Sequence, residues 1–446
     1  MSIVSLKACA QCLKLPYTGS DIYFSSISID TRTLKPGALF IAVQGTDFDG
    51  HDFIELACQK KAAAVITQFP LATKIPYLQV KDTRKALGML ARYHRQQFNL
   101  PIIALTGSCG KTTTKEYLSN ILKEYGSTLT AQKSFNNDIG VPLTLLKLNS
   151  THQFAVLEMG ANALGEIAWL THLAQPTIAM ILNIGSAHLE GFGSLQGVAQ
   201  AKTEILQGLS PTDIGIIHTN VMKTWGHFIP KAKKIILYGS HEKSRVSAHS
   251  ISLDSEGKAK FILIANAENI PIQLSLLGLH QVDNALAAAT AAVALNIPSE
   301  MIKIGLESTQ PISGRLNSCI SYHGANILDD TYNANPDSVK ASLDLLKHYK
   351  NKRILVLGDL AELGENSQAL LASIGHYARE LGIDQLLSVG SSSAEAGRAF
   401  GKHAFHFTEQ KALIHALDQQ LDAYCTVLIK GSRNSDMEKV VQALTK

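Results

Sequence analysis

Residues 106 to 113 read Thr-Gly-Ser-Cys-Gly-Lys-Thr-Thr, the composition of a phosphate-binding loop. Glycines let backbone N–H groups surround a phosphate, and the start of a helix adds free N–H groups and a positive dipole end. Lys111 can bridge the β- and γ-phosphates of ATP, and the Thr112 hydroxyl can bind Mg²⁺. The predicted ATP-binding residues of this loop are Gly107, Ser108, Cys109, Gly110, Lys111, Thr112 and Thr113.

The loop departs from the complete Walker pattern, because Leu105 stands where its first glycine is expected. The remaining G-x-x-G-K-T pattern is less specific, and an ordinary strand–helix turn is the alternative interpretation. The flanking segments favour the phosphate loop. A buried-strand run, Ile102 to Thr106, precedes it, and a helical pattern, Thr112 to Tyr125, follows it.

Two further side chains follow apolar runs that read as buried strands. Glu158 ends the run Ala155 to Glu158, and His188 follows the run that ends at Leu182. Residues at the carboxyl ends of parallel strands gather at one edge of a sheet, where ligands bind. We therefore expect Lys111, Glu158 and His188 to converge. A carboxylate and an imidazole beside a triphosphate suit Mg²⁺ binding or the orientation of water.

Composition limits the classes of protein that fit. With 446 residues and 46% hydrophobic residues, the chain is long enough for two or three domains and too apolar for intrinsic disorder. A net charge of +4 without a basic stripe disfavours nucleic acid as a partner. No apolar window is long enough for a transmembrane helix, and residues 1–14 lack the features of a signal peptide. We therefore expect a cytoplasmic protein.

The order of apolar runs predicts an α/β protein of three domains. Residues 1–83 mix short strands and helices, as in a small N-terminal α/β domain. Residues 84–313 alternate buried strands and helices, which predicts a central ATPase-like domain with a parallel sheet and the phosphate loop. Residues 314–446 repeat this alternation as a doubly wound, Rossmann-like C-terminal domain.

The sequence resembles the Mur ligases, ATP-dependent amide-bond-forming enzymes of peptidoglycan synthesis. The resemblance covers essentially the whole chain and rests on stretches in each predicted domain. Those stretches are Asp30–Arg32, Gly37–Phe40 and Asp49–Phe53, then Gly107–Thr113, Asn136–Pro142, Gly278–His280 and the Glu158 and His188 segments, and finally Asp329–Pro336, Leu357–Gly364 and Lys430–Arg433. The Asn136–Gly140 and Tyr332–Pro336 stretches point to the family member that adds a dipeptide.

The resemblance implies a domain for a UDP-sugar, a domain for ATP and a mobile C-terminal domain that closes over the site. It implies a monomer whose partners are UDP-N-acetylmuramoyl-tripeptide and D-alanyl-D-alanine. The tripeptide carboxylate accepts the γ-phosphoryl group of ATP, and the dipeptide amine then displaces phosphate from the acyl phosphate. Phosphorylation gives a poor acyl donor a good leaving group, while Mg²⁺ and Lys111 offset the negative charge.

The resemblance also assigns roles to single residues. Composition alone favours a surface role for Lys202, whereas the matching lysine of several relatives is carbamoylated and carries Mg²⁺-binding oxygens. The implied catalytic residues are Lys111, Glu158, His188 and Lys202, and the implied metal ligands are Thr112, Glu158, His188 and Lys202. Implied ATP contacts outside the loop are Asn284, Arg315 and Asp330, and implied substrate contacts are Asp30, Thr31, Arg32, Asn137, Asn333, Asn335 and Arg433.

Three alternatives compete with this interpretation: two are related ligases and one is a protein of a different class. A sibling ligase that adds the third amino acid usually carries an Asp-Asn-Pro-Arg-like stretch in its last domain, and the sequence has none. A folate-type ligase should lack a UDP-sugar domain. A nucleotide-gated switch protein would share the phosphate loop, but it would not need the Asp330–Pro336 and Lys430–Arg433 segments.

Overall fold

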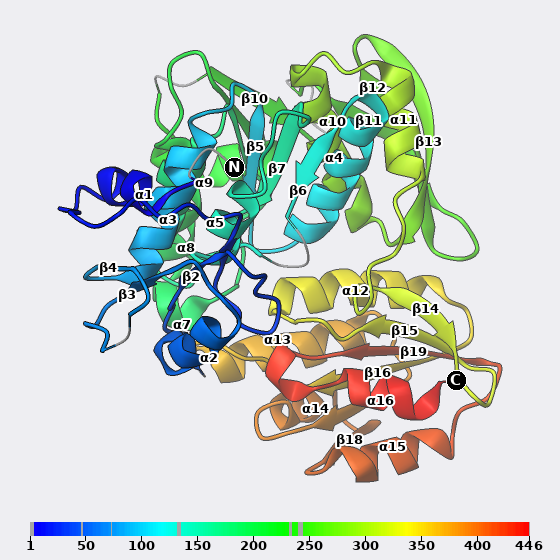
Figure 1. The fold of residues 1–446 in the computed structure, drawn as a ribbon. Helices are drawn as coiled ribbons and strands as arrows, with labels where there is room; N and C mark the ends of the chain where they lie inside the picture. Colours follow the sequence, from blue (N-terminus) through cyan, green and yellow to red (C-terminus); the bar gives the residue numbers. More distant parts are fainter. Residues whose placement is uncertain are drawn as a thin grey trace.

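The computed structural model describes residues 4–45, 48–72, 74–131, 135–231, 234–239 and 244–445. Within these ranges the strands form four β-sheets that follow one another along the chain (Figure 1). Three of the sheets are wholly or mainly parallel and flanked by helices, and one is small and antiparallel. The three-part α/β architecture that the sequence predicts is confirmed.

The first domain is built on a parallel sheet with the strand order β1-β2-β3-β4. Every residue of β2 and β3 is buried, as expected for short strands covered on both faces. The elements are α1 (Leu6–Cys12), β1 (Ile27–Ser28), β2 (Leu39–Ile41), α2 (Ile54–Gln59), β3 (Ala64–Thr67) and β4 (Tyr77–Gln79), with a 3₁₀ turn at Gly50–Phe53.

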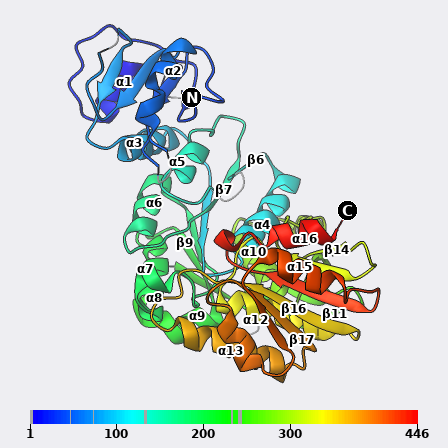
Figure 2. The ribbon, with the colours of Figure 1, turned by 90° about the horizontal axis from the view of Figure 1, so that it is seen from below.

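Helix α3 (Thr83–Arg95) connects the first domain to the rest of the chain. It begins at Asp82, whose carboxylate accepts a hydrogen bond from the Lys85 N–H at 2.9 Å, a typical N-cap. Leu90 packs in the core of the first domain, whereas Ala91 packs in the next core. Figure 2 shows the first domain projecting from one end of the molecule beyond this helix. The predicted boundary at residue 83/84 therefore falls at the start of a helix that serves both cores, and it stays a prediction.

The central sheet is parallel throughout, with the order β10-β9-β8-β5-β7-β6. All residues of β5, β7 and β8 are buried, because apolar cores lie on both faces. The strands are β5 (Ile102–Thr106), β6 (Thr128–Thr130), β7 (Phe154–Glu158), β8 (Ile178–Ile181), β9 (Ile214–His218) and β10 (Lys234–Tyr238). The helices are α4 (Lys111–Tyr125), α5 (Gly140–Leu145), α6 (Glu166–Ala174), α7 (Leu189–Phe192), α8 (Leu195–Thr203) and α9 (Thr219–Trp225).

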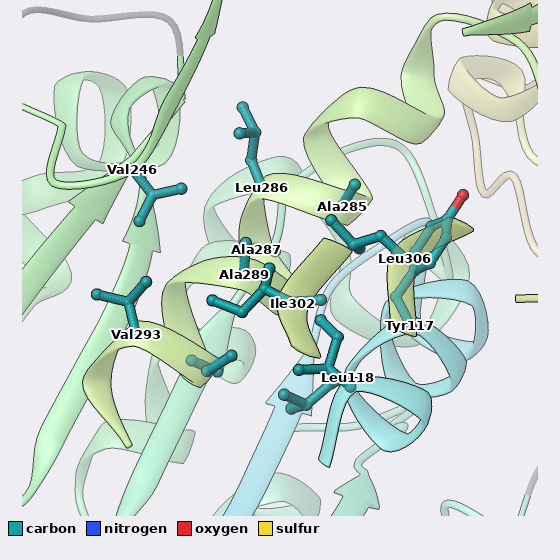
Figure 3. Close-up of a cluster of buried hydrophobic side chains, with 14 of the residues drawn as sticks. Tyr117, Leu118, Val246, Ala285, Leu286, Ala287, Ala289, Val293, Ile302 and Leu306 are labelled. Carbon is teal, nitrogen blue, oxygen red and sulfur yellow. The ribbon is translucent and has the colours of Figure 1, made fainter. Parts of the chain in front are cut away.

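Helix α4, which follows the phosphate loop, is fixed by close packing against α10 (His280–Ala294) and α11 (Ser299–Glu307). Figure 3 shows Tyr117 and Leu118 of α4 beside Ile302 and Leu306 of α11 and the alanines of α10. The small side chains of α10 let its backbone approach closely. All of these residues are almost fully buried, so the first turn of α4 has a rigid base.

An antiparallel sheet that the sequence did not predict as a unit follows the central sheet. It consists of β11 (Ser247–Leu253), β12 (Lys258–Ala265) and β13 (Glu268–Leu277). Its turn contacts the last domain, since His348 Nε2 lies 2.8 Å from the Asp254 carbonyl oxygen and the Tyr349 hydroxyl donates to the Glu256 carbonyl at 2.8 Å. The sheet therefore joins the central and last domains outside the linker.

The third domain has the strand order β14-β15-β19-β16-β17-β18, and only its edge strand β14 is antiparallel. The strands are β14 (Asn317–Ile320), β15 (Asn326–Asp330), β16 (Lys352–Gly358), β17 (Gln385–Val389), β18 (Ala404–Phe407) and β19 (Cys425–Lys430). The helices are α12 (Pro336–His348), α13 (Ser367–Glu380), α14 (Ala394–Phe400), α15 (Gln410–Asp418) and α16 (Glu438–Leu444). Among the residues described, no helix combines the length and apolar character needed to cross a membrane.

Candidate active site

The predicted phosphate loop lies where β5 ends and α4 begins. Gly110 is the N-cap of α4 and has a φ of 77°, a left-handed value that glycine adopts without strain. A Cβ atom at this position would lie 2.2 Å from Oδ1 of Asn284 on α10. No side chain caps the helix, so its first N–H groups remain free to bind phosphate oxygens.

The segment after β8 holds the loop in shape. Asn183 Oδ1 accepts a hydrogen bond from the Cys109 N–H at 2.8 Å, and Asn183 Nδ2 donates to the Cys109 carbonyl at 3.0 Å. The Ser108 hydroxyl donates to the Gly185 carbonyl at 3.0 Å and accepts from the Gly185 N–H at 2.9 Å. Two neighbouring strand ends are thereby tied together at the edge of the sheet, and these hydrogen bonds fix the shape of the loop.

Lys111 folds back over its own loop. Its Nζ donates to the Gly107 carbonyl at 2.7 Å. Burial lowers the pKa of this ammonium, and the positive charge of Arg315 lowers it further, while Glu158 and Cys109 act in the opposite direction. A buried cation whose neighbours offset it only in part is stabilised by an anion, and phosphate is the anion that this loop fits.

Glu158 meets Thr112 as the sequence predicts. The Thr112 hydroxyl donates to Glu158 Oε2 at 2.9 Å, and Asn136 Nδ2 donates to Oε1 at 2.8 Å. The carboxylate is 2% exposed. Each of its oxygens therefore has a hydrogen-bond partner, and Oε2 faces the start of α4.

Lys202, near the end of α8, is one of the largest buried polar side chains and is 1% exposed. Among the described residues, its Nζ has no hydrogen-bond partner. Burial lowers the pKa of this amine to about 7, and the charge of Lys111 adds to the effect. The Nζ lies 5.6 Å from the centre of the Phe192 ring. At neutral pH a large share of Lys202 is therefore an uncharged, nucleophilic amine.

His188 also lies beside Phe192, with the two ring centres 6.4 Å apart. Its backbone φ of 55° is left-handed. Its Nδ1 contacts the carboxylate of Glu362, which comes from the loop after β16 in the third domain. This contact holds the pKa of Glu362 below its ordinary value. His188 and Lys202 are thus both near one aromatic ring, and a third-domain residue reaches the imidazole.

The donors present suit a magnesium–nucleotide complex better than a metal ion bound by protein alone. The described residues include no group of three or more His, Cys, Asp and Glu side chains that could hold a metal. Mg²⁺ at nucleotide sites keeps several waters and takes only one or two protein oxygens besides phosphates. The Thr112 hydroxyl beside the Glu158 carboxylate provides oxygens of this kind.

The predicted adenine side of the site lies against the same loop. Asn284 Oδ1 accepts from the Thr114 hydroxyl at 3.3 Å, and Asn284 Nδ2 donates to Gln281 Oε1 at 2.9 Å. Burial lowers the pKa of the neighbouring His280. Asn284 is thus oriented by α4 and α10 and touches the loop directly, whereas its contact with adenine stays a prediction.

Asp330 ends β15 and forms a buried ion pair. Its Oδ2 accepts a hydrogen bond from Lys430 Nζ at the end of β19, and the Ser342 hydroxyl donates to the same oxygen at 2.7 Å. Lys430 Nζ also donates to the Asn333 carbonyl at 3.2 Å. The predicted contact of Asp330 with ATP therefore requires a carboxylate that already has two partners.

Two arginines lie over one tyrosine ring at the start of the third domain. The guanidinium of Arg315 is 4.2 Å from the centre of the Tyr332 ring, and that of Arg433 is 6.0 Å away. Arg433 also pairs with Glu438 at 3.0 Å and is largely exposed. Asn333 Oδ1 accepts from the Ala334 N–H at 2.9 Å, which is a local turn contact. The ring brings the predicted ATP and peptide contacts Arg315 and Arg433 to the same place.

Helix α12 presents its N-terminus to the phosphate loop. Asn335 caps the helix, since its Oδ1 accepts from the Ser338 N–H at 2.8 Å. The same side chain contacts Cys109 Sγ, with Nδ2 at 3.2 Å and Oδ1 at 3.3 Å. Asp337 Oδ2 accepts from the Ser186 N–H at 2.7 Å across the same interface. Burial raises the pKa of the Cys109 thiol, so this thiol lines the loop as a neutral group.

The remaining predicted substrate contacts lie apart from the loop or have local partners. Arg32 forms a bidentate pair with Asp30 in the first domain, which lowers the pKa of Asp30, and Thr31 is buried. Asn137 Oδ1 accepts from the Gly140 N–H at 2.8 Å, which fixes the turn before α5. The structure does not bring these residues to the phosphate loop, and their contacts with substrate stay predictions.

Sequence reasoning missed four residues that shape this site: Asn136, Asn183, Glu362 and Lys430. Each stands inside or beside a stretch that marks the site, yet residue type alone does not distinguish a working side chain from its neighbours. Asn136 holds the carboxylate, whereas Asn137, the predicted residue, holds a turn. Position along the chain could have identified two of them, because Asn183 follows a buried strand and Lys430 ends one.

Three family models match consecutive parts of the chain. They are described as "Mur ligase family, catalytic domain" for residues 23–95, "Mur ligase middle domain" for residues 105–292, and "Mur ligase, glutamate ligase domain" for residues 314–433. The phosphate loop, Glu158, His188 and Lys202 all lie within the middle match, and Asp330, Glu362 and Lys430 lie within the last one.

Whole-chain relatives agree with these matches. A protein from Escherichia coli (strain K12) named "UDP-N-acetylmuramoyl-tripeptide--D-alanyl-D-alanine ligase" is 41% identical, covering 100% of this chain and 99% of the relative. A crystal structure of MurF from Acinetobacter baumannii is similar with a TM-score of 0.89 and 34% identity, covering 97% of both chains. A MurF ligase from Thermotoga maritima solved in complex with ADP is similar with a TM-score of 0.84 and 27% identity, covering 94% of this chain and 96% of that one.

Proposed function

The chain belongs to the Mur ligase family, and we propose that it joins D-alanyl-D-alanine to the tripeptide carboxylate of UDP-N-acetylmuramoyl-tripeptide, converting ATP to ADP and phosphate. The product is the pentapeptide precursor of peptidoglycan. The observation that carries this assignment is 41% identity, over the full length of both chains, to a relative with this name.

The reaction proceeds in two balanced steps. A carboxylate oxygen of the tripeptide attacks the γ-phosphorus of ATP, so that a new O–P bond forms while the bond to ADP breaks. The amine of D-alanyl-D-alanine then attacks the acyl carbon, inorganic phosphate leaves with its bonding electrons, and the amine loses a proton. The first step brings two negative groups together, and the second develops negative charge on the acyl oxygen and the leaving phosphate, so the site must supply positive charge and N–H donors.

The phosphate loop supplies these groups. The free N–H groups at the start of α4 and the Lys111 ammonium face the space that the β- and γ-phosphates fill. When ATP binds, Lys111 exchanges its hydrogen bond to the Gly107 carbonyl for phosphate oxygens. Arg315 places a second positive charge close enough to lower the pKa of Lys111. Asn284 and Asp330 complete the proposed ATP contacts, and Asn284 is supported by its position against Gly110.

Thr112, Glu158, His188 and Lys202 would hold Mg²⁺ with the nucleotide. Bound Mg²⁺ neutralises phosphate charge during phosphoryl transfer. Glu158 supports this role because both carboxylate oxygens are oriented by partners, Thr112 and Asn136. An oxygen donor that is already ordered loses little freedom when it binds a metal ion.

Lys202 enters this set as a carbamate. Its buried, unpartnered amine with a pKa of about 7 is uncharged often enough to attack CO₂, forming an N–C bond and releasing a proton. The carbamate replaces an orphaned buried amine with an anion near Lys111. Incubation with ¹³C-bicarbonate should give a carbamate NMR signal that is missing in Lys202→Ala, and the same variant should lose most ligase activity. Unchanged turnover in that variant would contradict the proposed role of Lys202 as a carbamate.

We assign the UDP-sugar to residues 1–83, ATP to residues 84–313 and the closing domain to residues 314–446. Asp30, Thr31 and Arg32 are the proposed uridine-side contacts, and the ordered Asp30–Arg32 pair supports a polar recognition surface there. Asn137, Asn333, Asn335 and Arg433 are the proposed contacts of the peptide and the dipeptide. Asn335 caps α12 and contacts Cys109 of the loop, and Arg433 lies beside the Tyr332 ring.

The protein is proposed to act as a cytoplasmic monomer. One chain supplies both the phosphate loop and the third-domain residues that face it, so the site needs no second subunit. All six cysteines are free thiols, as is usual in a reducing compartment.

Phosphate release from Mg-ATP tests the function. We expect release only when UDP-N-acetylmuramoyl-tripeptide and D-alanyl-D-alanine are both present, with a pentapeptide product by mass. Omitting each component in turn provides the controls. Release that does not depend on the dipeptide would contradict the assignment and would favour a sibling ligase that adds the third amino acid, or a plain ATPase.

A further inference from the structure

Two loops from different domains meet at His188. The Nδ1 atom of this imidazole contacts the Glu362 carboxylate, and the Glu190 N–H donates to the Glu362 carbonyl oxygen at 3.2 Å. His188 and Glu362 both have left-handed backbones, with φ of 55° and 60°. Such values are uncommon for residues with side chains and persist where the surroundings enforce them. Both loops are therefore held in a defined conformation at the contact.

The contact carries little stabilising energy. The His188 side chain is 27% exposed and that of Glu362 is 46% exposed, and ion pairs this open to water contribute little to stability. Docking of the third domain does not depend on it, because Asn335, Asp337 and the turn between β11 and β12 also contact across the interface. The arrangement calls for an explanation other than stability.

The geometry points to orientation of the imidazole. A carboxylate that faces Nδ1 favours the tautomer with the proton on Nδ1, and Nε2 is then left with a free lone pair. Histidines that bind metal ions usually have such a carboxylate or carbonyl on their other ring nitrogen, and its loss lowers metal affinity. The Phe192 ring, which meets His188 edge-on, limits the orientations of the imidazole further.

We propose that Glu362 is a positioning residue that orients His188 for the divalent cation of the nucleotide, and does so only when the third domain is docked. This proposal rests on the proposed function, because that function gives His188 its metal. It makes metal affinity depend on domain closure. Glu362 itself touches neither metal nor substrate in this scheme.

Asp337 provides the matched control. It also reaches the central domain through one carboxylate oxygen, at the Ser186 N–H, but it does not contact the imidazole. Asp337→Ala and Glu362→Ala thus each remove one interdomain contact, and only the second removes the group beside Nδ1. A difference between them separates orientation of His188 from docking of the domain.

The readout is binding of Mn²⁺, a paramagnetic substitute for Mg²⁺, measured by electron paramagnetic resonance with the full chain and ADP. We expect Glu362→Ala to weaken Mn²⁺ binding by about 10–100-fold and Asp337→Ala to leave it within about twofold. Glu362→Gln should recover much of the affinity, since its amide oxygen can keep a partial negative charge beside Nδ1. In ligation assays, Glu362→Ala should raise the Mg²⁺ concentration for half-maximal rate in parallel.

Equal Mn²⁺ affinity in wild type and Glu362→Ala, or equal weakening in both alanine variants, would overturn the proposal. If Glu362→Ala does not fold, Glu362→Gln provides the test. A Mn²⁺ affinity of Glu362→Gln as low as that of His188→Ala would also overturn the proposal. Mn²⁺ binding with ADP does not need the peptide substrates. Absence of ligation by the wild type would therefore refute the proposed function alone.

Discussion

Within the central domain, backbone and side-chain partners hold three residues of the phosphate loop: Ser108, Cys109 and Thr112. The third domain reaches the same region through single side chains, those of Asn335 and Asp337. The first arrangement follows from a parallel sheet, which brings strand ends together whenever it folds. The second depends on how two domains dock. One half of the site is therefore organised by folding and the other half by closure.

The difference also appears in the charges. In the central domain, burial lowers the pKa of both Lys111 and Lys202, and the positive charge of Lys111 lowers that of Lys202 further. In the third domain, Asp330 and Lys430 neutralise one another in a buried pair. The central domain thus favours an anionic ligand, whereas the Asp330–Lys430 pair of the third domain needs no ligand to balance its charge. Substitutions in the central domain and in the third domain should therefore differ in their effects on activity and on stability.

The largest effect is expected for the Asp330–Lys430 pair. Lys430→Met leaves a buried carboxylate without its cation, which should lower the free energy of unfolding of the third domain by about 3–5 kcal/mol. Both tryptophans, Trp169 and Trp225, lie in the central domain, so their fluorescence reports that domain, and hydrogen exchange in β15 and β19 reports the third. We expect faster hydrogen exchange in β15 and β19, with a nearly unchanged melting temperature by tryptophan fluorescence.

The double variant Asp330→Asn/Lys430→Met is the control for this prediction, because it removes the orphaned charge as well. This double variant should recover most of the protection of β15 and β19 against hydrogen exchange. Exchange in β15 that does not change in Lys430→Met would show that the pair contributes nothing to the third domain, and the contrast between the two halves would fail.

Lys111→Met should cost catalysis rather than stability. Removing one preorganised cation beside the transferred phosphate typically lowers rates by about 10²–10³-fold. The unfolding midpoint should rise or stay constant, since burial disfavours the charged form of this lysine. Steady-state ligation and thermal melting measure the two effects, and Lys123→Met, an exposed residue of the same helix, is the control. A large drop in stability would contradict a ligand-dependent role for Lys111.

The sequence predicts the central half of the site better than the third-domain half. Ile102–Thr106 and Glu158 are apolar runs and strand ends, and parallel-sheet geometry alone places them together. The pairing of Cys109 with Asn335 joins residues 226 positions apart in different domains, and no local pattern encodes such a docking contact. The burial of Lys202 was not readable from composition, and only the family resemblance pointed to it.

Edges and small sheets were the weak points of the fold prediction. The inner strands β15, β16, β17 and β19 read as continuous apolar runs, whereas the edge strands β14 and β18 are half-exposed and lack that pattern. Strand β12 alternates inward and outward residues, which is the period of a two-faced sheet and was available to find. Its pairing with β11 and β13 is a tertiary contact that periodicity alone does not select.

The pH dependence of stability in Lys202→Met tests whether the central domain buries an amine with a lowered pKa. The folded pKa of about 7 lies below the ordinary value of 10.5, so between these values the unfolded chain binds more protons. Wild-type stability should therefore rise with pH from 7 to 10.5, and the cost of burying the ammonium is full below pH 7. In CO₂-free buffer, Lys202→Met should be more stable by about 1–3 kcal/mol at pH 6.5, and the gap should close toward pH 10.

Urea unfolding across this pH range measures the gap, with Lys123→Met as the control that shows no such trend. The variant should be inactive although it is more stable. A gap that is independent of pH would mean that Lys202 carries an ordinary pKa, and its buried amine would then need a partner that the described contacts do not include.

The smallest effect is expected at Asn335, where stability and docking overlap in one side chain. Asn335→Ala removes the N-cap of α12, which should lower the free energy of unfolding by about 1 kcal/mol, and it also removes the contact with Cys109. Asn335→Asp separates the two roles. Aspartate caps a helix as well as asparagine does, so unfolding should return to the wild-type value. Its negative charge, however, faces the loop that binds ATP phosphates, so the KM for ATP should rise. If the aspartate variant instead keeps the wild-type KM, the α12 terminus does not face the nucleotide during turnover, and the two halves of the site meet elsewhere.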